Sequence, residues 1–277
     1  MRFDIAETDR ARTRGEDQED TARFRRTAGR LRIGFVFTRK ELDRTKLSGA
    51  IERVLGRPVD LVRAAAYTDL AEAVTESQVD VAWLPPAVYL HVRRALGVRL
   101  AAMVERSGAD DYRSALLCRT GTIETMEDLS GARAAWVDPW SAAGYLMPRA
   151  LIRAHGLDPS AILRERFVGS YDAALEALAS REAEIAGAYC TVARDGRLLD
   201  QSWSPEARVR VLATSAPIPS DVICTTGALS SSDAIAIENA LASDEARSVA
   251  HALGGTGLAR PDPAHYDALE RAVGRRT

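Results

Sequence analysis

Short apolar runs alternate with amphipathic segments along most of the chain. The first three runs cover residues 31–37 (LRIGFVF), 58–65 (PVDLVRAA) and 79–84 (VDVAWL), and each is typical of a strand. The first of them is suited to a strand buried on both faces. Helical patterns around residues 47–55 and 70–74 separate these runs. Strands and helices in this order predict a parallel α/β sheet with right-handed crossovers.

A second set of strand and helix patterns follows, and it predicts a second α/β unit rather than an extension of the first. The helix that begins near Ser141 is expected to run to about residue 151 and to end near His155 and Gly156. The pattern predicts further helices over 171–179 and 234–253, and strands over 114–118, 132–138, 166–170, 184–190, 209–215 and 221–227.

The composition places the chain among globular proteins. It has 277 residues, 46% of them hydrophobic and 27% charged, which is enough for one large domain or two smaller ones. The 37 basic residues nearly balance the 39 acidic ones, so no strong field draws the protein to nucleic acid or to an anionic membrane. No stretch reaches the roughly 18 apolar residues of a membrane span, and we expect no membrane insertion.

The first 30 residues differ from the rest, with eight Arg and seven Asp or Glu and few large apolar side chains. We expect residues 1–30 to form a flexible charged tail, with a docking arm as the alternative. They contain neither the apolar core of a signal peptide nor a lipobox cysteine, which predicts a cytoplasmic protein. A true start further upstream would instead allow a periplasmic location.

Residue types with common catalytic or metal-binding roles do not occur at the usual spacings. The three cysteines lie far apart without a zinc-site spacing, and the four histidines form no HExxH motif. No GxSxG elbow, phosphate loop or GxGxxG is present, and GGTG at 254–257 is typical of a helix stop. We expect no catalytic residues, no metal and no cofactor.

The segment DPWSAAGY at residues 138–145 is the clearest candidate for ligand contact. A predicted strand ends here, Pro139 breaks it, and Ser141 is placed to cap a helix whose first N–H groups favour an anion. In an open α/β sheet, ligands lie beyond the carboxyl ends of the strands, where such helices begin. An ordinary N-cap without a ligand remains the alternative.

Four stretches of the chain resemble the phosphate/phosphonate-type (PhnD-like) solute-binding proteins of ABC transporters. The resemblance covers roughly residues 31–277, and its most specific parts are DP-x-S-x-x-GY at 138–145 and PIP at 217–219. It implies the type 2 periplasmic-binding-protein fold: two mixed-sheet α/β lobes joined by two crossing strands, with the ligand between them. Lobe one would comprise residues 31–115 plus 216–277, and lobe two residues 116–215.

The chain departs from the family pattern where the ligand would bind. Relatives usually have Ser-Thr-Ser at the helix start, whereas this chain has Ser141, Ala142 and Ala143. Each missing charge-assisted hydrogen bond to a phosphoryl oxygen costs roughly 1.5–3 kcal/mol in a desolvated site. Tyr171 follows Ser170 where relatives often have His, so the cleft is expected to be less polar.

Aromatic side chains are the expected lining of this cleft, since they combine apolar area with a polar tip. Tyr67, Trp140 and Tyr171 are the favoured aromatic contacts. Asp221 either meets a cationic group or stabilises the hinge. The predicted ligand-binding residues are Tyr67, Trp83, Pro85, Trp140, Ser141, Ala142, Ala143, Gly144, Ser170, Tyr171 and Asp221.

The resemblance and the motif search together favour non-enzymatic binding of a small anionic or aromatic organic ligand by closure of two lobes. Fold alone does not decide function, so two alternatives stay open. One is a diverged enzyme of cofactor biosynthesis, and the other is a ligand-sensing module of a cytoplasmic regulator. Beyond the ligand, the expected partner is a transporter permease or a regulatory protein.

Overall fold

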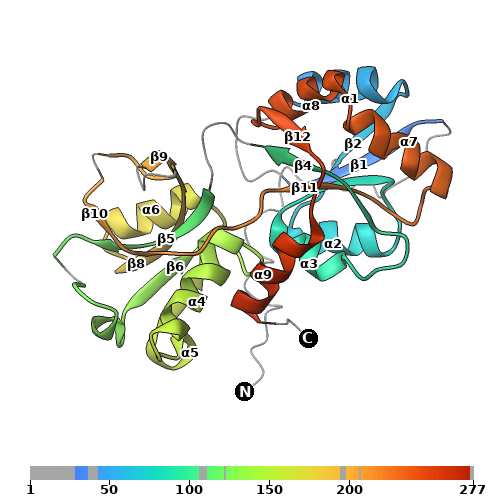
Figure 1. The fold of residues 1–277 in the computed structure, drawn as a ribbon. Helices are drawn as coiled ribbons and strands as arrows, with labels where there is room; N and C mark the ends of the chain where they lie inside the picture. Colours follow the sequence, from blue (N-terminus) through green and yellow to red (C-terminus); the bar gives the residue numbers. More distant parts are fainter. Residues whose placement is uncertain are drawn as a thin grey trace, which may run out of the picture.

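Two six-stranded mixed sheets form two α/β lobes, shown side by side in Figure 1. The computed structural model describes residues 29–36, 43–105, 111–121, 123–193, 198–205 and 207–274. The tail expected over residues 1–30 therefore lies outside the described residues, apart from Gly29 and Arg30, and so does Phe37 at the end of the first predicted strand.

The first sheet places three parallel strands beside antiparallel ones. Its order is β12 (Gly257–Ala259), β4 (Arg99–Glu105), β11 (Val222–Thr225), β3 (Val81–Leu84), β1 (Leu31–Phe35) and β2 (Val59–Arg63). Strand β1 runs parallel to β2 and β3, while β11 runs antiparallel to both β3 and β4. The helices of this lobe are α1 (Arg44–Leu55), α2 (Tyr67–Thr75), α3 (Pro86–Val92), α7 (Ser231–Leu241) and α8 (Arg247–Ala252).

The second sheet repeats the mixed arrangement. Its order is β10 (Val209–Thr214), β5 (Asp111–Arg119), β8 (Ile185–Val192), β6 (Arg133–Trp136) and β7 (Arg164–Phe167), with β9 (Leu198–Gln201) paired to β8. Strand β6 is parallel to β7 and β8, whereas β5 is antiparallel to β8 and β10. Its helical elements are a 3-10 turn (Glu127–Leu129), a π-helical turn (Ala142–Leu146), α4 (Met147–Ala154), α5 (Pro159–Ile162) and α6 (Tyr171–Ala179).

The chain passes between the sheets twice, once between β4 and β5 and once between β10 and β11. At the crossing, the amide of Ile218 donates to the carbonyl of Tyr112 at 2.7 Å, and the two residues form an isolated antiparallel bridge. The amide of Ser215 donates to the carbonyl of Ser114 at 2.8 Å. The bilobal fold with two crossing segments is therefore confirmed. Strand β5 begins at Asp111, so residues 111–115, which the predicted limits assign to lobe one, lie on the second sheet.

The C-terminal helix α9 (Pro263–Val273) lies at the junction of the two lobes in Figure 1. Its Tyr266 is fully buried, and the hydroxyl donates to the carbonyl of Ser220 at 2.7 Å. Arg93 of α3 holds the helix to the first lobe through Asp267 and Glu270, both at 2.6 Å. On the opposite side, Leu269 of α9 packs in an apolar cluster with Ala142, Ala143, Leu146 and Met147 of the second lobe.

Most predicted elements are present, with two corrections. The helical region expected over 234–253 is two helices, because Ser243 takes an extended backbone conformation (φ −79°, ψ 160°) and a 3-10 turn (Asp244–Ala246) follows it. The strand expected over 166–170 is β7, which begins at Arg164 and ends at Phe167. Among the described helices, none is long and apolar enough to cross a membrane.

One tight contact fixes the position of the π-helical turn. A Cβ added at Gly187 of β8 would lie 2.6 Å from the carbonyl oxygen of Gly144 and 2.9 Å from its Cα. Backbone atoms cannot move aside as the end of a flexible side chain can. The sheet and the π-helical turn therefore approach as closely as they do only because residue 187 has no side chain.

The first prediction concerns this contact. Gly187→Ala is expected to lower the free energy of unfolding by about 1–3 kcal/mol, because the turn must shift away from β8. Gly49→Ala in helix α1 is the matched control, because a Cβ there meets nothing within 4 Å. This change should raise the free energy of unfolding by about 0.5–1 kcal/mol. Urea unfolding of both variants measures the difference, and a Gly187→Ala protein as stable as the parent would contradict the predicted clash.

Candidate functional site

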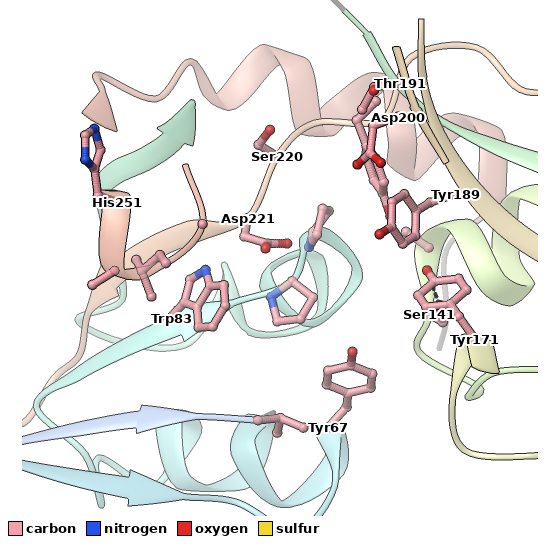
Figure 2. A pocket seen from close by; sticks show the side chains of 18 of the residues that line it. Tyr67, Trp83, Ser141, Tyr171, Tyr189, Thr191, Asp200, Ser220, Asp221 and His251 are labelled. Atoms are coloured by element: carbon pink, nitrogen blue, oxygen red, sulfur yellow. Dashed lines mark hydrogen bonds between the residues drawn. The ribbon is translucent and has the colours of Figure 1, made fainter. Parts of the chain in front are cut away.

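A cavity of about 410 Å³ lies between the two lobes, and residues from both sheets line it. It opens where parallel strands of each sheet end, which is where ligands bind in open α/β sheets. Figure 2 shows Tyr67, Trp83 and Asp221 on one side, with Ser141, Tyr171 and Tyr189 facing them. Its lining residues are Val36, Asp43, Lys46, Tyr67, Trp83, Pro85, Pro86, Tyr112, Ser141, Ala142, Tyr171, Tyr189, Thr191, Asp200, Ser220, Asp221, His251, Ala252, Leu253 and Gly254.

Three helical segments begin at this cavity. Tyr67 is the first residue of α2, Tyr171 is the first residue of α6, and Ala142 begins the π-helical turn that continues into α4. The first N–H groups of a helix have no partner within it, and the peptide dipoles leave a partial positive charge at this end. Each of these helix starts therefore contributes a partial positive charge at the cavity wall.

The hydroxyls of Ser141 and Tyr171 lie together at the second-lobe wall. Ser141 caps the π-helical turn, since its Oγ accepts from the amide of Gly144 at 3.0 Å. The same Oγ lies 3.3 Å from the Tyr171 hydroxyl, and either oxygen can donate. Burial raises the pKa of the Tyr171 phenol, and the charge of Asp221 acts in the same direction. Tyr171 therefore stays a neutral hydrogen-bond donor at physiological pH.

Tyrosine rings form the remainder of this wall. The rings of Tyr171 and Tyr189 meet edge to face, with centroids 5.1 Å apart and an angle of 81°. Tyr112 lies next to Tyr189, with ring centroids 6.1 Å apart. The edge-to-face pair of Tyr171 and Tyr189 is a favoured arrangement of aromatic rings. The second lobe thus presents an aromatic surface to the cavity.

Carboxylates outnumber ammonium groups in the cavity lining. Among the described lining residues, the carboxylates are Asp43, Asp200 and Asp221, and the nitrogen bases are Lys46 and His251. Four of these five side chains are exposed at the rim, whereas Asp221 is half-buried. Figure 2 shows the Asp221 carboxylate turned towards the second lobe. Inside the cavity, the negative charge of Asp221 therefore faces the positive helix starts.

Seven of the predicted ligand-binding residues line the cavity. These are Tyr67, Trp83, Pro85, Ser141, Ala142, Tyr171 and Asp221.

The structure places the other four predicted residues outside the lining. Trp140 packs against an apolar cluster of the first lobe and meets His91 edge to face at 4.5 Å. Ala143 is fully buried, and its carbonyl accepts from the Ser114 hydroxyl at 2.7 Å. Gly144 has Val137 where a Cβ would be, only 2.5 Å away. Ser170 caps α6, accepting from the amide of Ala173 at 3.1 Å.

Sequence reasoning did not identify the strand residues of the second-lobe wall. Tyr112 and Tyr189 come from β5 and β8, and Asp200 comes from β9, which the apolar pattern did not predict. Apolar and polar residues do not alternate clearly along β8, because side chains on both faces of this strand are buried. The available sequence signal was a tyrosine, Tyr189, within the otherwise small and apolar run at residues 185–190.

No group of three or more His, Cys, Asp or Glu side chains able to hold a metal ion is found among the described residues.

The sequence matches one protein-family model across most of its length. Residues 40–266 match the family described as ABC transporter, phosphonate, periplasmic substrate-binding protein. The chain belongs to this family. The resemblance stated from the sequence is thereby confirmed.

Three proteins show how similar the chain is to known relatives. The phosphate-import protein PhnD of Mycolicibacterium smegmatis (strain ATCC 700084 / mc(2)155) is 27% identical over 191 residues, which are 65% of this chain and 59% of that protein. The structure of XAC2383 from Xanthomonas citri bound to ATP has a TM-score of 0.72 and 15% identity, covering 89% of this chain and 97% of the other. The structure of PhnD1 from Prochlorococcus marinus (MIT 9301) in complex with methylphosphonate has a TM-score of 0.70 and 13% identity, covering 87% and 96%.

The second prediction concerns the pH dependence of stability. Because the pKa of Tyr171 is raised in the folded protein, its contribution to stability is fully present below about pH 10 and is lost as the pH rises further. The free energy of unfolding should therefore fall above about pH 10, and Tyr171→Phe should make that fall less steep. Urea unfolding at pH 9, 10 and 11 measures both slopes, and equal slopes would contradict the prediction.

Proposed function

We propose that this protein binds a small organic ligand between its lobes and presents it to an ABC-transporter permease. The ligand carries an anionic group at one end and a cationic group at the other. One observation carries this proposal: the helix start at Ser141 and Ala142 on one lobe and the carboxylate of Asp221 on the other border the same cavity.

The anionic end fits the second lobe. The N–H groups at the start of the π-helical turn favour negative charge, and the hydroxyls of Ser141 and Tyr171 add polar contacts. Ala142 and Ala143 supply no hydroxyls there, so a dianion finds fewer donors than in relatives with Ser-Thr-Ser. Each absent charge-assisted bond is worth roughly 1.5–3 kcal/mol. The anionic group is therefore held mainly by backbone N–H groups and by these two hydroxyls.

The cationic end fits Asp221. Asp221 is half-buried in the cavity lining, whereas Lys46 is exposed. A ligand with only negative charge would bring like charge towards Asp221 in a partly desolvated space. A zwitterion instead places one charge against each lobe. Its contacts to both lobes favour the closed arrangement by their differential affinity, which is how a binding protein signals occupancy.

Family membership supports the transport partner and the small-molecule ligand. The relatives point to phosphorus oxyanions: one is named for phosphate import, and another was solved with methylphosphonate. None of the comparisons favours a cofactor-biosynthesis enzyme or a regulatory module. The cytoplasmic location expected from the first residues stays a prediction.

The third prediction tests the charge of Asp221. Asp221→Asn is expected to weaken binding of 2-aminoethylphosphonate by roughly 10–100-fold, since a charge-assisted contact is lost. The same change should leave methylphosphonate binding unchanged or slightly stronger, because that ligand has no cationic group. Isothermal titration calorimetry with both ligands gives the two affinities for each protein.

Asp200→Asn is the matched control. It removes the same charge from the rim, where the side chain is exposed, and should change either affinity by less than about fivefold. If Asp221→Asn and Asp200→Asn behave alike, Asp221 does not contact the ligand. If no organic anion raises the melting temperature of the parent protein, the proposed function is wrong.

A further inference from the structure

Three polar side chains form one row across neighbouring strands of the second sheet. Tyr112 of β5 pairs with Thr191 of β8, and Thr191 pairs with Asp200 of β9. Residues paired directly across neighbouring strands project from the same face of a sheet, and all three border the cavity between the lobes. We refer to Tyr112, Thr191 and Asp200 as the polar row.

Thr191, in the middle of the polar row, has a hydroxyl without an internal partner. Only 6% of the residue is exposed, although it borders the cavity. Within the described part of the chain, the Thr191 hydroxyl forms no hydrogen bond. A buried hydroxyl left without a partner destabilises a structure once water is excluded. When the lobes close, a group of the ligand must therefore replace the water that satisfies this hydroxyl.

Other polar groups border the same part of the cavity. One carboxylate oxygen of Asp200 accepts from the amide of Gln201 at 2.8 Å, and the other has no hydrogen-bond partner among the described residues. Figure 2 shows Ser220 and His251 on the first-lobe side and Thr191 and Asp200 on the second-lobe side. Hydroxyl and neutral imidazole groups donate and accept hydrogen bonds, whereas a carboxylate only accepts. Ligand hydroxyls, which also donate and accept, match this set of partners.

The polar row is separated from the helix start that favours an anion. Gly187 contacts the π-helical turn, and Thr191 lies four residues further along β8, roughly 13 Å away at about 3.3 Å per residue. Methylphosphonate and 2-aminoethylphosphonate are too short to reach both places. The cavity of about 410 Å³ lies within the range of roughly 300–1,000 Å³ that is typical of sites for larger organic ligands.

The spacing within the polar row also bears on the ligand. Its three residues come from three neighbouring strands, and such strands lie about 4.8 Å apart. A single charged group on the ligand is compact and reaches only part of such a row. Several hydroxyls along one carbon chain are instead spread over a comparable width.

We infer that the polar row is a second subsite, which binds a chain of hydroxyl groups on a ligand whose anionic group lies at the helix start of Ser141. This inference rests on the proposed function and names the substrate class of the same cavity. That class is an organic phosphonate or phosphate monoester that carries a polyol chain. The inference leaves unchanged the group that meets Asp221.

The test compares two phosphate monoesters that differ in the length of the polyol. D-Glucitol 6-phosphate has a six-carbon chain with hydroxyls up to its far end, whereas glycerol 3-phosphate has only three carbons. Calorimetry on the full chain is expected to give at least roughly tenfold tighter binding of glucitol 6-phosphate, because only the longer chain reaches the polar row.

The outcomes separate the inference from the proposed function. Equal binding of the two polyol phosphates overturns the inference, because the additional hydroxyls would then contribute nothing. If 2-aminoethylphosphonate or methylphosphonate binds and neither polyol phosphate does, the inference is wrong and the proposed anion site stands. If none of these four compounds binds, both the inference and the proposed function are wrong.

A matched pair of variants tests Thr191 itself. Thr191→Val removes the hydroxyl and keeps the branched shape, and it should lower the preference for glucitol 6-phosphate over glycerol 3-phosphate by roughly 3–10-fold. Thr191→Ser keeps the hydroxyl and should preserve most of this preference. The readout is the ratio of two affinities in one protein, which a general loss of folded protein does not change. An unchanged ratio in Thr191→Val overturns the inference.

A third probe tests whether the polar row binds hydroxyls or a cation. 6-Aminohexyl phosphate has a chain of the same length with an ammonium group at its far end and no hydroxyls. Thr191→Val and Asp200→Asn are each expected to weaken binding of glucitol 6-phosphate more than binding of this amine. If both variants weaken binding of the amine more strongly, the polar row binds a cation and the inference is overturned.

Discussion

The second-lobe wall of the cavity depends on the position of one helix start. The π-helical turn is held against the second sheet by two contacts: the Ser114 hydroxyl donates to the carbonyl of Ala143, and Gly187 approaches Gly144 closely. The Ser141 cap on the amide of Gly144 fixes the start of the turn itself. These contacts leave little freedom for the turn to move relative to β8. The anion-favouring end of the helix is therefore already ordered in the folded protein. Ligand binding does not have to spend free energy on ordering this segment.

The fold was largely predictable from the sequence, because buried strands and amphipathic helices leave strong periodic signals. The helix over 171–179 was predicted with the bounds that the structure shows, since Ser170 caps it and the apolar face is regular. Strands β4 and β12 and helix α9 were not identified, because their positions depend on pairing and packing between distant segments. Local patterns carry no information about such partners.

The site was predictable only in part, for a related physical reason. Residues at helix starts, such as Tyr67, Ser141 and Tyr171, follow from the rule that places ligands beyond the ends of parallel strands. Trp140 follows the same strand as Ser141, yet its ring packs away from the cavity against His91. Sequence adjacency to a site thus does not fix the direction of a side chain. Tyr189 shows the converse, since it contributes to the wall from the middle of a strand.

Helix α9 contacts both lobes. Its ion pairs with Arg93 and the bond from Tyr266 to Ser220 fasten it to the first lobe, whereas Leu269 packs on the helical segment that begins at the anion-favouring end. Because α9 contacts both lobes, rotation of one lobe against the other changes the packing of Leu269 on this segment. A substitution at Leu269, which does not line the cavity, would therefore change the ligand affinity by shifting the fraction of molecules competent to bind.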